Sequence, residues 1–413
     1  MSCPNPFRIP AFLLITLCAA GVYGQGPYQS YQPQQIDRYV GEQVPDIWDE
    51  SQPIERFLSA VAKRSRLSVE YLHWDLKGPQ SGTLGAPITD VDDPSVAFEV
   101  FDNLNAGAIT GLAIVPDINS MGMEDASGVR GTLDVALNGG SLELSFFGTG
   151  QNGSDVNFPN LQANRIADPT GNTDGLGTSF LPNIVTPLTT NGVANSSTTM
   201  NSFVYDNSFQ ASIDGQLWGS EVLLLKELYL PNEAFNWQWL GGFRYISYDE
   251  EMMQLGTFND GGELATPRVT RIGGNSVNNV YGPQIGGRAS IRTEYITLSA
   301  TPRIAFALND HTSSVMTGPL TALDEPVVRI TEESIHFTPV VEINLQMQIH
   351  VTPHFSIVGG YDLFYIMQTS RPSHNIVYDS TAGGAAFTPD IGQKVSLKQF
   401  MAQGINIGGL WTY

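Results

Sequence analysis

Residues 335–365 read IHFTPVVEINLQMQIHVTPHFSIVGGYDLFY and carry the pattern that decides the fold. Apolar side chains such as Ile343 and Leu345 alternate with polar ones such as Glu342 along this stretch. Successive side chains of a β-strand point to opposite faces of the sheet, so the alternation predicts a strand with one apolar and one polar face. Pro353 interrupts the pattern, which then resumes, and we expect a β-hairpin here.

The same alternation recurs along most of the chain. It predicts ten strands, near residues 67–76, 129–137, 142–146, 203–217, 235–245, 281–292, 296–308, 335–349, 355–365 and 398–413. Long connections at 78–126, 149–200, 250–278, 310–334 and 369–397 alternate with turns of a few residues. This arrangement is typical of an all-β, up-and-down antiparallel transmembrane β-barrel with long extracellular loops and short periplasmic turns. A hairpin hidden in residues 78–126 would raise the count from ten strands to twelve.

The first residues resemble an export signal. Arg8 precedes a mostly apolar run from Ile9 to Ala20, and small residues allow cleavage after Gly24. We therefore predict a signal peptide at 1–24, a periplasmic linker with a short helix at 25–66, and the barrel at 67–413. The chain would be exported to the bacterial cell outer membrane.

The composition excludes one function class and suggests where the charge lies. The formal net charge is −21 and only 15% of residues are charged, so no basic face is available for nucleic acid. The five long connections hold 22 of the acidic residues and 6 of the basic ones. We expect no cofactor, but these acidic segments suggest weak Ca²⁺ binding, with Asp90, Asp92 and Asp93 as a weak candidate metal site.

Charged residues on the strands are expected to face the lumen, because a charge facing lipid at mid-bilayer costs about 2–4 kcal/mol. The predicted lumen charge network is Arg130, Asp134, Glu143, Asp206, Asp214, Arg244, Arg288, Arg292, Arg303, Glu342 and Asp362. Its near balance of acids and bases favours pairing across the lumen. Ten strands enclose a narrow interior, so an occluded lumen is favoured over a wide pore, and an anion-selective constriction is the alternative.

Aromatic side chains are expected at the two membrane interfaces. The candidates are Trp74, Trp218, Trp237, Trp239, Tyr281, Tyr295, Phe337, Tyr361 and Trp411. At the end of the chain, Ile405, Ile407, Trp411 and Tyr413 occupy alternate positions up to a C-terminal aromatic. We interpret them as a signal for the barrel-assembly machinery.

Several segments resemble a known family, the outer-membrane β-barrel proteins of planctomycete bacteria. They are EYLHW at 70–74, LGGFRY at 240–245, YGPQIG at 281–286, PVVEINL at 339–345, GYDLFY at 360–365 with Arg371-Pro372, and QGINIG at 403–408. The resemblance covers most of residues 67–413. It implies residence in the outer membrane. The family has no established activity, ligand or catalytic residue that could be carried over to this sequence.

Signals for catalysis are weak. The glycines of residues 148–153 match G-x-G-x-x-G after a strand, but no helix is expected to follow, so a glycine-rich surface loop is favoured. Asp310 with His311, or His374, would allow a hydrolase at the barrel rim. We predict instead that the protein is not an enzyme. It would be a monomer in contact with outer-membrane lipid, with a structural role or that of a narrow passive conduit. The alternative is a surface-binding or adhesion module that uses the long loops.

Overall fold

The computed structural model describes part of the chain. The described residues are 65–78, 82–102, 108–137, 139–161, 166–167, 179–180, 182–228, 235–258, 268–320, 325–381 and 388–413. They all belong to the second of two compact units, Met1–Arg56 and Phe57–Tyr413. The predicted signal peptide and nearly all of the predicted linker lie outside them. Among the described residues, no helix has the length and apolar character that a bilayer crossing requires.

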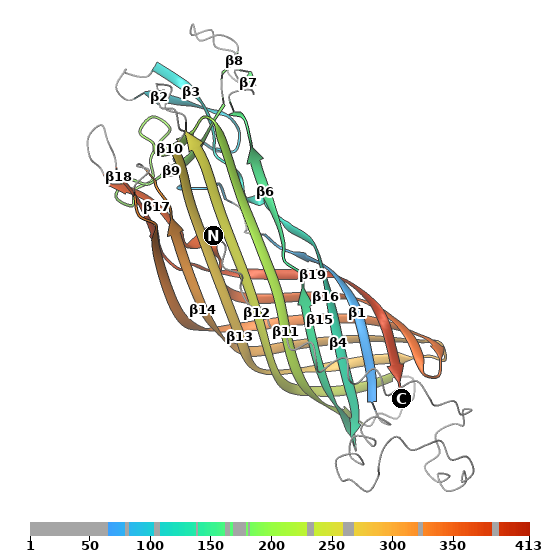
Figure 1. Ribbon diagram of the computed structural model, residues 1–413. Helices are drawn as coiled ribbons and strands as arrows, with labels where there is room; N and C mark the ends of the chain where they lie inside the picture. Colours follow the sequence, from blue (N-terminus) through green and yellow to red (C-terminus); the bar gives the residue numbers. More distant parts are fainter. Residues whose placement is uncertain are drawn as a thin grey trace, which may run out of the picture. The chain divides into compact units, whose positions relative to one another are not determined.

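Ten strands pair into a closed antiparallel ring (Figure 1). They are β1 (Ser65–Leu76), β4 (Met123–Leu137), β5 (Gly140–Thr149), β11 (Ser208–Leu228), β12 (Phe235–Phe258), β13 (Arg268–Arg292), β14 (Ile296–Thr317), β15 (Val328–Thr352), β16 (Phe355–Ser370) and β19 (Leu397–Thr412). The last strand closes the ring on the first, with Ile407 opposite Tyr71. The ten-stranded barrel is confirmed. Each predicted strand has a counterpart in the ring, although residues 203–205 of the predicted strand 203–217 lie in a separate sheet.

The hairpin expected as an alternative within residues 78–126 exists, but it does not join the ring. Its strands β2 (Phe98–Asp102) and β3 (Ala108–Ile114) belong to a separate sheet with β9 (Pro182–Leu188) and β10 (Asn201–Tyr205). The ring therefore keeps ten strands. Two further pairs, β7 (Ile166–Ala167) with β8 (Ser179–Phe180) and β17 (Ile376–Thr381) with β18 (Thr388–Gln393), also lie outside it. The short helices are η2 (Ile118–Ser120) and α3 (Pro372–Asn375).

The glycine-rich segment 148–153 is not the surface loop that the sequence suggested. It joins β5 to β6 (Asn152–Phe158), and both strands pair with successive parts of β11. A Cβ atom at Gly153 would lie 2.2 Å from the carbonyl oxygen of Ile213. The glycine is needed because two backbones approach closely there.

The ring strands are much longer than expected. β12 has 24 residues, and β13 and β15 have 25 each, whereas a tilted membrane crossing needs about 9 to 11. The predicted loops 250–278 and 310–334 are therefore wrong in extent, because most of their residues continue the strands. Five of the acidic residues assigned to loops lie on these strand extensions, namely Glu250, Glu251, Asp310, Glu332 and Glu333.

A change in the phase of the alternation marks where the strands leave the membrane. Along β11, Leu217 and the apolar residues before it face inward, whereas Val222 and Leu224 after it face outward. The same change occurs at Ile246 on β12 and at Val280 on β13, and these two residues are opposite each other. The apolar outer face thus ends at one level, and polar outer residues follow it.

Aromatic side chains gather at this level. Trp218 lies 5.1 Å from Tyr245 between ring centroids, and Tyr245 is opposite Tyr281 on the next strand. Trp237 and Trp239 stack edge to face near the short turns. Trp74 is a correction to the predicted girdle, because its side chain faces inward and is 2% exposed.

Candidate functional site: the layered lumen

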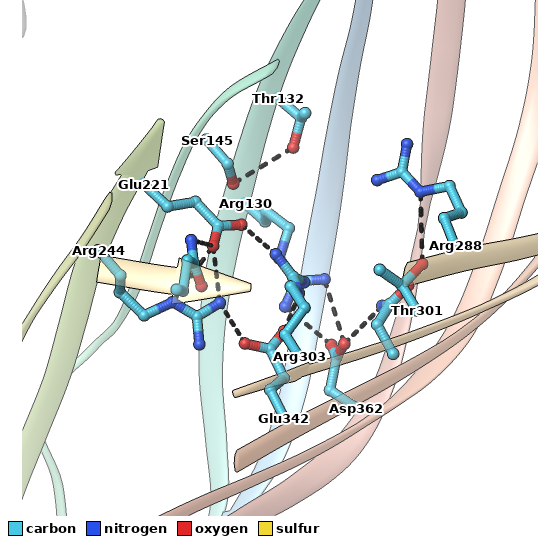
Figure 2. Close-up of polar contacts among 12 residues, drawn as sticks. Arg130, Thr132, Ser145, Glu221, Arg244, Arg288, Thr301, Arg303, Glu342 and Asp362 are labelled. Carbon is cyan, nitrogen blue, oxygen red and sulfur yellow. Dashed lines mark hydrogen bonds and ion pairs between the residues drawn. The ribbon is translucent and has the colours of Figure 1, made fainter. Parts of the chain in front are cut away.

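Inward-facing charged residues gather inside the ring (Figure 2), at the level where the outer face is apolar. Alternation explains their direction, because the neighbouring residues on each strand are apolar and point outward. The cluster is made of two groups of ion pairs and a third pair nearer the short turns, and its residues come from several ring strands.

The first group is a quartet of two acids and two bases. Glu221 of β11 accepts hydrogen bonds from Arg244 Nη2 at 2.7 Å and from Arg303 Nη1 at 2.5 Å. Glu342 of β15 pairs with the same two arginines, with its Oε1 at 2.7 Å from Arg303 Nη2. Gln284 Nε2 also donates to Glu221, at 3.0 Å. Charge is balanced within the quartet. Two of its ion pairs join opposite residues of neighbouring strands, and the other two, Arg303 with Glu221 and Arg244 with Glu342, connect strands that are not neighbours in the ring.

The second group is centred on Arg130 of β4. Its guanidinium donates to both carboxylate oxygens of Asp362, at 3.3 and 3.0 Å, and lies 3.5 Å from Glu70 Oε2. Asn344 and Asn406 also donate to Asp362, at 2.6 and 2.9 Å. Such bidentate contacts hold the guanidinium in a defined orientation as well as pairing its charge.

The third pair lies nearer the short turns. Arg288 Nη2 donates to Glu143 Oε2 at 2.7 Å across the lumen, and its Nε donates to Thr301 at 3.3 Å. Asp134 is half-buried on the same inward face of β4 as Arg130. The ion pairs thus include seven of the eleven residues predicted for the lumen network, and Asp134 lies on the same side of the wall.

Three predicted members lie elsewhere, and their positions are corrections. Asp206 is in the turn between β10 and β11, outside the ring. Asp214 lies on the outer face of β11, because in the strand extension the apolar side chains face inward and the polar ones face solvent. Arg292 is exposed at the end of β13, beside the short turn.

Two carboxylates of the cluster were missed from the sequence. Glu70 is on the inward face of β1, between Ser68 and Leu72. Glu221 follows the phase change on β11, so the apolar residues of the first half of the strand suggested the wrong face. In the middle strands the predicted inward arginines outnumber the acids. Because buried arginines need partners, this excess was the available signal that further carboxylates face the lumen.

An apolar layer lies next to the charge cluster. Each of the ten ring strands contributes at least one inward side chain that is at most 6% exposed: Trp74, Ala126, Phe147, Leu217, Ile246, Val280, Ala307, Val340, Phe364 and Ala402. Phe147 contacts both Trp74 and Phe364, with ring centroids 5.5 and 6.4 Å apart. Arg130 lies over the Trp74 ring at 5.7 Å and Arg244 over the Phe364 ring at 5.8 Å, so cation–π contacts join the two layers.

The chain between β16 and β17 fills the interior beyond the apolar layer. Arg371 is 1% exposed and donates to Glu250 Oε2 at 2.8 Å and to the carbonyl oxygen of Gly78 at 2.9 Å. Asn375 of α3 donates to Ser313 at 2.9 Å and to Ser370 at 2.7 Å. Charged, apolar and polar layers thus follow one another inside the ring.

The histidines do not form the predicted rim dyad. His311 points inward and is fully buried, whereas Asp310 is on the opposite face of β14. His311 instead stacks on His336, with ring centroids 5.2 Å apart. His374 lies in α3, and its Nδ1 is 3.0 Å from Ser373 Oγ.

Two carboxylates of the weak candidate metal site accept hydrogen bonds from neighbouring serines. Asp90 accepts hydrogen bonds from the backbone N–H and the hydroxyl of Ser197, both at 2.7 Å. Asp93 accepts one from the backbone N–H of Ser95 at 3.1 Å. In the ranges that the structure describes, no three His, Cys, Asp or Glu side chains gather as a metal would require. Of the predicted assembly signal, Ile405, Ile407 and Trp411 lie on the outer face of β19, with Ile405 57% and Ile407 59% exposed, and Tyr413 follows the end of the strand.

The barrel is similar to solved outer-membrane proteins. The outer membrane protease OmpT from Escherichia coli has a TM-score of 0.45 and 12% identity, over 85% of this chain and 97% of that one. The toluene transporter TbuX from Ralstonia pickettii has a TM-score of 0.20 and 8% identity, over 84% and 89%. A mutant of the monoaromatic hydrocarbon channel TodX has a TM-score of 0.25 and 10% identity, over the same shares. No curated protein matches the chain.

A family description, in contrast, covers nearly the whole barrel. Residues 67–413 match the family BBP7, putative beta barrel porin-7. This range starts within β1 and runs to the end of the chain, so it includes the ring and the layers inside it. The chain therefore belongs to the putative beta barrel porin-7 family.

Proposed function

We propose that this outer-membrane barrel has a closed lumen and a structural role, and that it is neither an open pore nor an enzyme. The observation that carries the proposal is the apolar layer, to which all ten ring strands contribute buried side chains. A hydrated ion would have to displace this layer, because desolvating a charge among apolar groups is very costly. The charge cluster beside it adds a second obstruction.

Ion pairing in the cluster supports the same proposal. The lumenal arginines donate to carboxylates at hydrogen-bonding distance and leave little charge available to attract an anion. An anion-selective constriction needs unpaired bases that line an open path. The narrow passive conduit remains the competing function within this class.

Planar-bilayer conductance of the refolded protein tests the proposal. We expect no steady unitary current from the wild-type protein at moderate voltage, with an open porin inserted under the same conditions as a positive control. Insertion is verified separately from the shift in gel mobility that folded barrels show before heating. Steady unitary currents from verified insertions would refute the closed lumen and favour the conduit.

The part outside the ring favours surface binding as a second candidate function. Val193 is 66% exposed at the tip of a turn whose Gly192 N–H donates to Asp379 at 3.0 Å. An ordered tip with an exposed apolar side chain suits contact with another surface. Equal adherence of cells that display the wild-type protein and the Val193→Asp variant would argue against this role.

The proposal extends to the oligomeric state, the membrane and the assembly route of the protein. The protein would work as a monomer in a planctomycete outer membrane, inserted by the barrel-assembly machinery after removal of its signal peptide. Exposure of the alternate residues at the C-terminus supports recognition of that segment before the ring closes.

A further inference from the structure

A groove crosses the outer wall of the barrel near the short turns. It has a volume of about 580 Å³ and is lined by residues of β12 to β16. Small residues, Ala289, Ala300 and Gly359, form its floor, and larger apolar ones such as Ile291 and Met347 form its walls. The groove is thus a recess within the apolar outer face.

Strand register explains how the recess forms. One row of directly opposite residues contains Ile291, Leu298, Met347 and Gly359, so it is large on β13 to β15 and small on β16. The next row contains Ala289, Ala300, Leu345 and Tyr361, so it is small on β13 and β14 and large on β15 and β16. The small positions, Ala289, Ala300 and Gly359, therefore lie diagonally across the wall on either side of β15, where both residues are large.

We propose that this groove holds one acyl chain of a phospholipid from the leaflet on the short-turn side. The groove is continuous with the apolar band that faces lipid in an outer-membrane barrel, because Phe243, Phe306 and Ile343 extend that band away from the turns and are also exposed. Ile291 and Leu298 flank the short turn between β13 and β14, so the groove opens toward that leaflet.

An acyl chain suits the recess better than a second copy of the protein does. A flexible chain adapts to a diagonal groove, whereas two rigid barrels would meet at the high points of the wall. Within lipid the apolar surface gives no hydrophobic driving force, so residence depends on van der Waals contact along the groove. Filling the groove should therefore release the lipid without altering the lumen, whether or not the lumen conducts.

Gly359→Leu is the test variant and Gly131→Leu is its matched control. A Cβ at Gly359 would lie 3.7 Å from the carbonyl oxygen of Asn406, an ordinary contact, and a Cβ at Gly131 would meet nothing within 4 Å. Both substitutions add leucine to the lipid-facing wall, but only Gly359 belongs to the groove. Ala300→Leu is a second variant that fills the groove from β14.

Native mass spectrometry of the full chain measures the bound lipid after exchange from vesicles of dioleoyl phosphatidylcholine into detergent. We expect the wild-type protein and Gly131→Leu to retain one phospholipid each. Retention should fall at least about fivefold in Gly359→Leu, the effect of losing roughly ten carbon contacts. Gel mobility before heating verifies that each variant is folded, and Ala300→Leu replaces Gly359→Leu if the latter is not.

Three results would overturn the proposal. The first is equal retention by the wild-type protein and both groove-filling variants. The second is failure of the wild-type protein to retain phospholipid. The third is a wild-type dimer that Gly359→Leu converts to a monomer, because the groove would then be an interface between two copies.

Discussion

Neutralising Glu221 tests whether the lumenal charges act as a buried, balanced cluster. The carboxylate is 8% exposed and accepts hydrogen bonds from Arg244, Arg303 and Gln284. In Glu221→Gln the two arginines of the quartet share one carboxylate, Glu342, so one buried positive charge loses its partner. Breaking a buried ion pair on one side costs about 3–5 kcal/mol, and we expect the free energy of unfolding to fall by that amount.

The assay is equilibrium unfolding by denaturant in lipid vesicles, followed by tryptophan fluorescence. Glu227→Gln is the matched control, because Glu227 is an exposed carboxylate near the end of the same strand, and we expect it to cost less than about 1 kcal/mol. Adding Arg244→Gln to Glu221→Gln restores charge balance and should recover about 1–3 kcal/mol of the sum of the single effects. A loss in Glu221→Gln equal to that of Glu227→Gln would refute the reasoning and indicate a hydrated lumen.

Four further predictions concern the other layers, the strand contacts and the chain end. Burial and the neighbouring imidazole lower the pKa of His311 below its usual value, so the unfolded chain takes up the proton more readily and stability is lost as the pH falls below about 6.5. His311→Phe should reduce the loss of unfolding free energy between pH 7.5 and pH 5, and equal losses would contradict this. Phe364→Ala should cost about 3–5 kcal/mol through a cavity in the apolar layer, which the same denaturant assay measures; a cost below 1 kcal/mol would mean that the layer is loosely packed. Gly242→Ala should prevent folding, because its Cβ would lie 1.9 Å from the carbonyl oxygen of Val222, whereas Gly131→Ala should fold normally in a vesicle refolding assay. Tyr413→Ser should lower the amount of barrel in isolated outer membranes without changing stability after refolding, and unchanged amounts would argue against the assembly signal.

Alternation predicted the ring well because the membrane imposes one simple rule on every strand. Residues that face lipid must be apolar, so Ile343 and Leu345 indicate their face without knowledge of the partners. The same rule placed Arg244 and Arg303 inside. It could not show that Arg303 also meets Glu221 or that Arg130 meets Asp362, because these contacts join strands that are neighbours neither in the sequence nor in the ring.

The errors in strand length and in the faces of Asp214 and Trp74 share one physical cause. Beyond the membrane the outer surface meets water and the interior is packed, so the apolar face of each strand becomes the inward one. Asp214 and Trp74 were placed on the wrong faces for this reason. The phase change at Leu217 and Trp218 is visible in the sequence, and it would have shown both the long extensions and the level at which the strands leave the lipid.

The common level of these phase changes gives the barrel only one stable depth. Successive residues of a strand are about 3.3 Å apart along it. A displacement of the barrel by a few residues toward its short-turn end would therefore carry the outward-facing Asp249 and Asp310 toward hydrocarbon. An upward displacement would bring Trp218 and Tyr281 out of the interface. The apolar band thus fixes the depth of the barrel in the bilayer. A force applied to its outer end is transmitted to the membrane with little movement along the barrel axis.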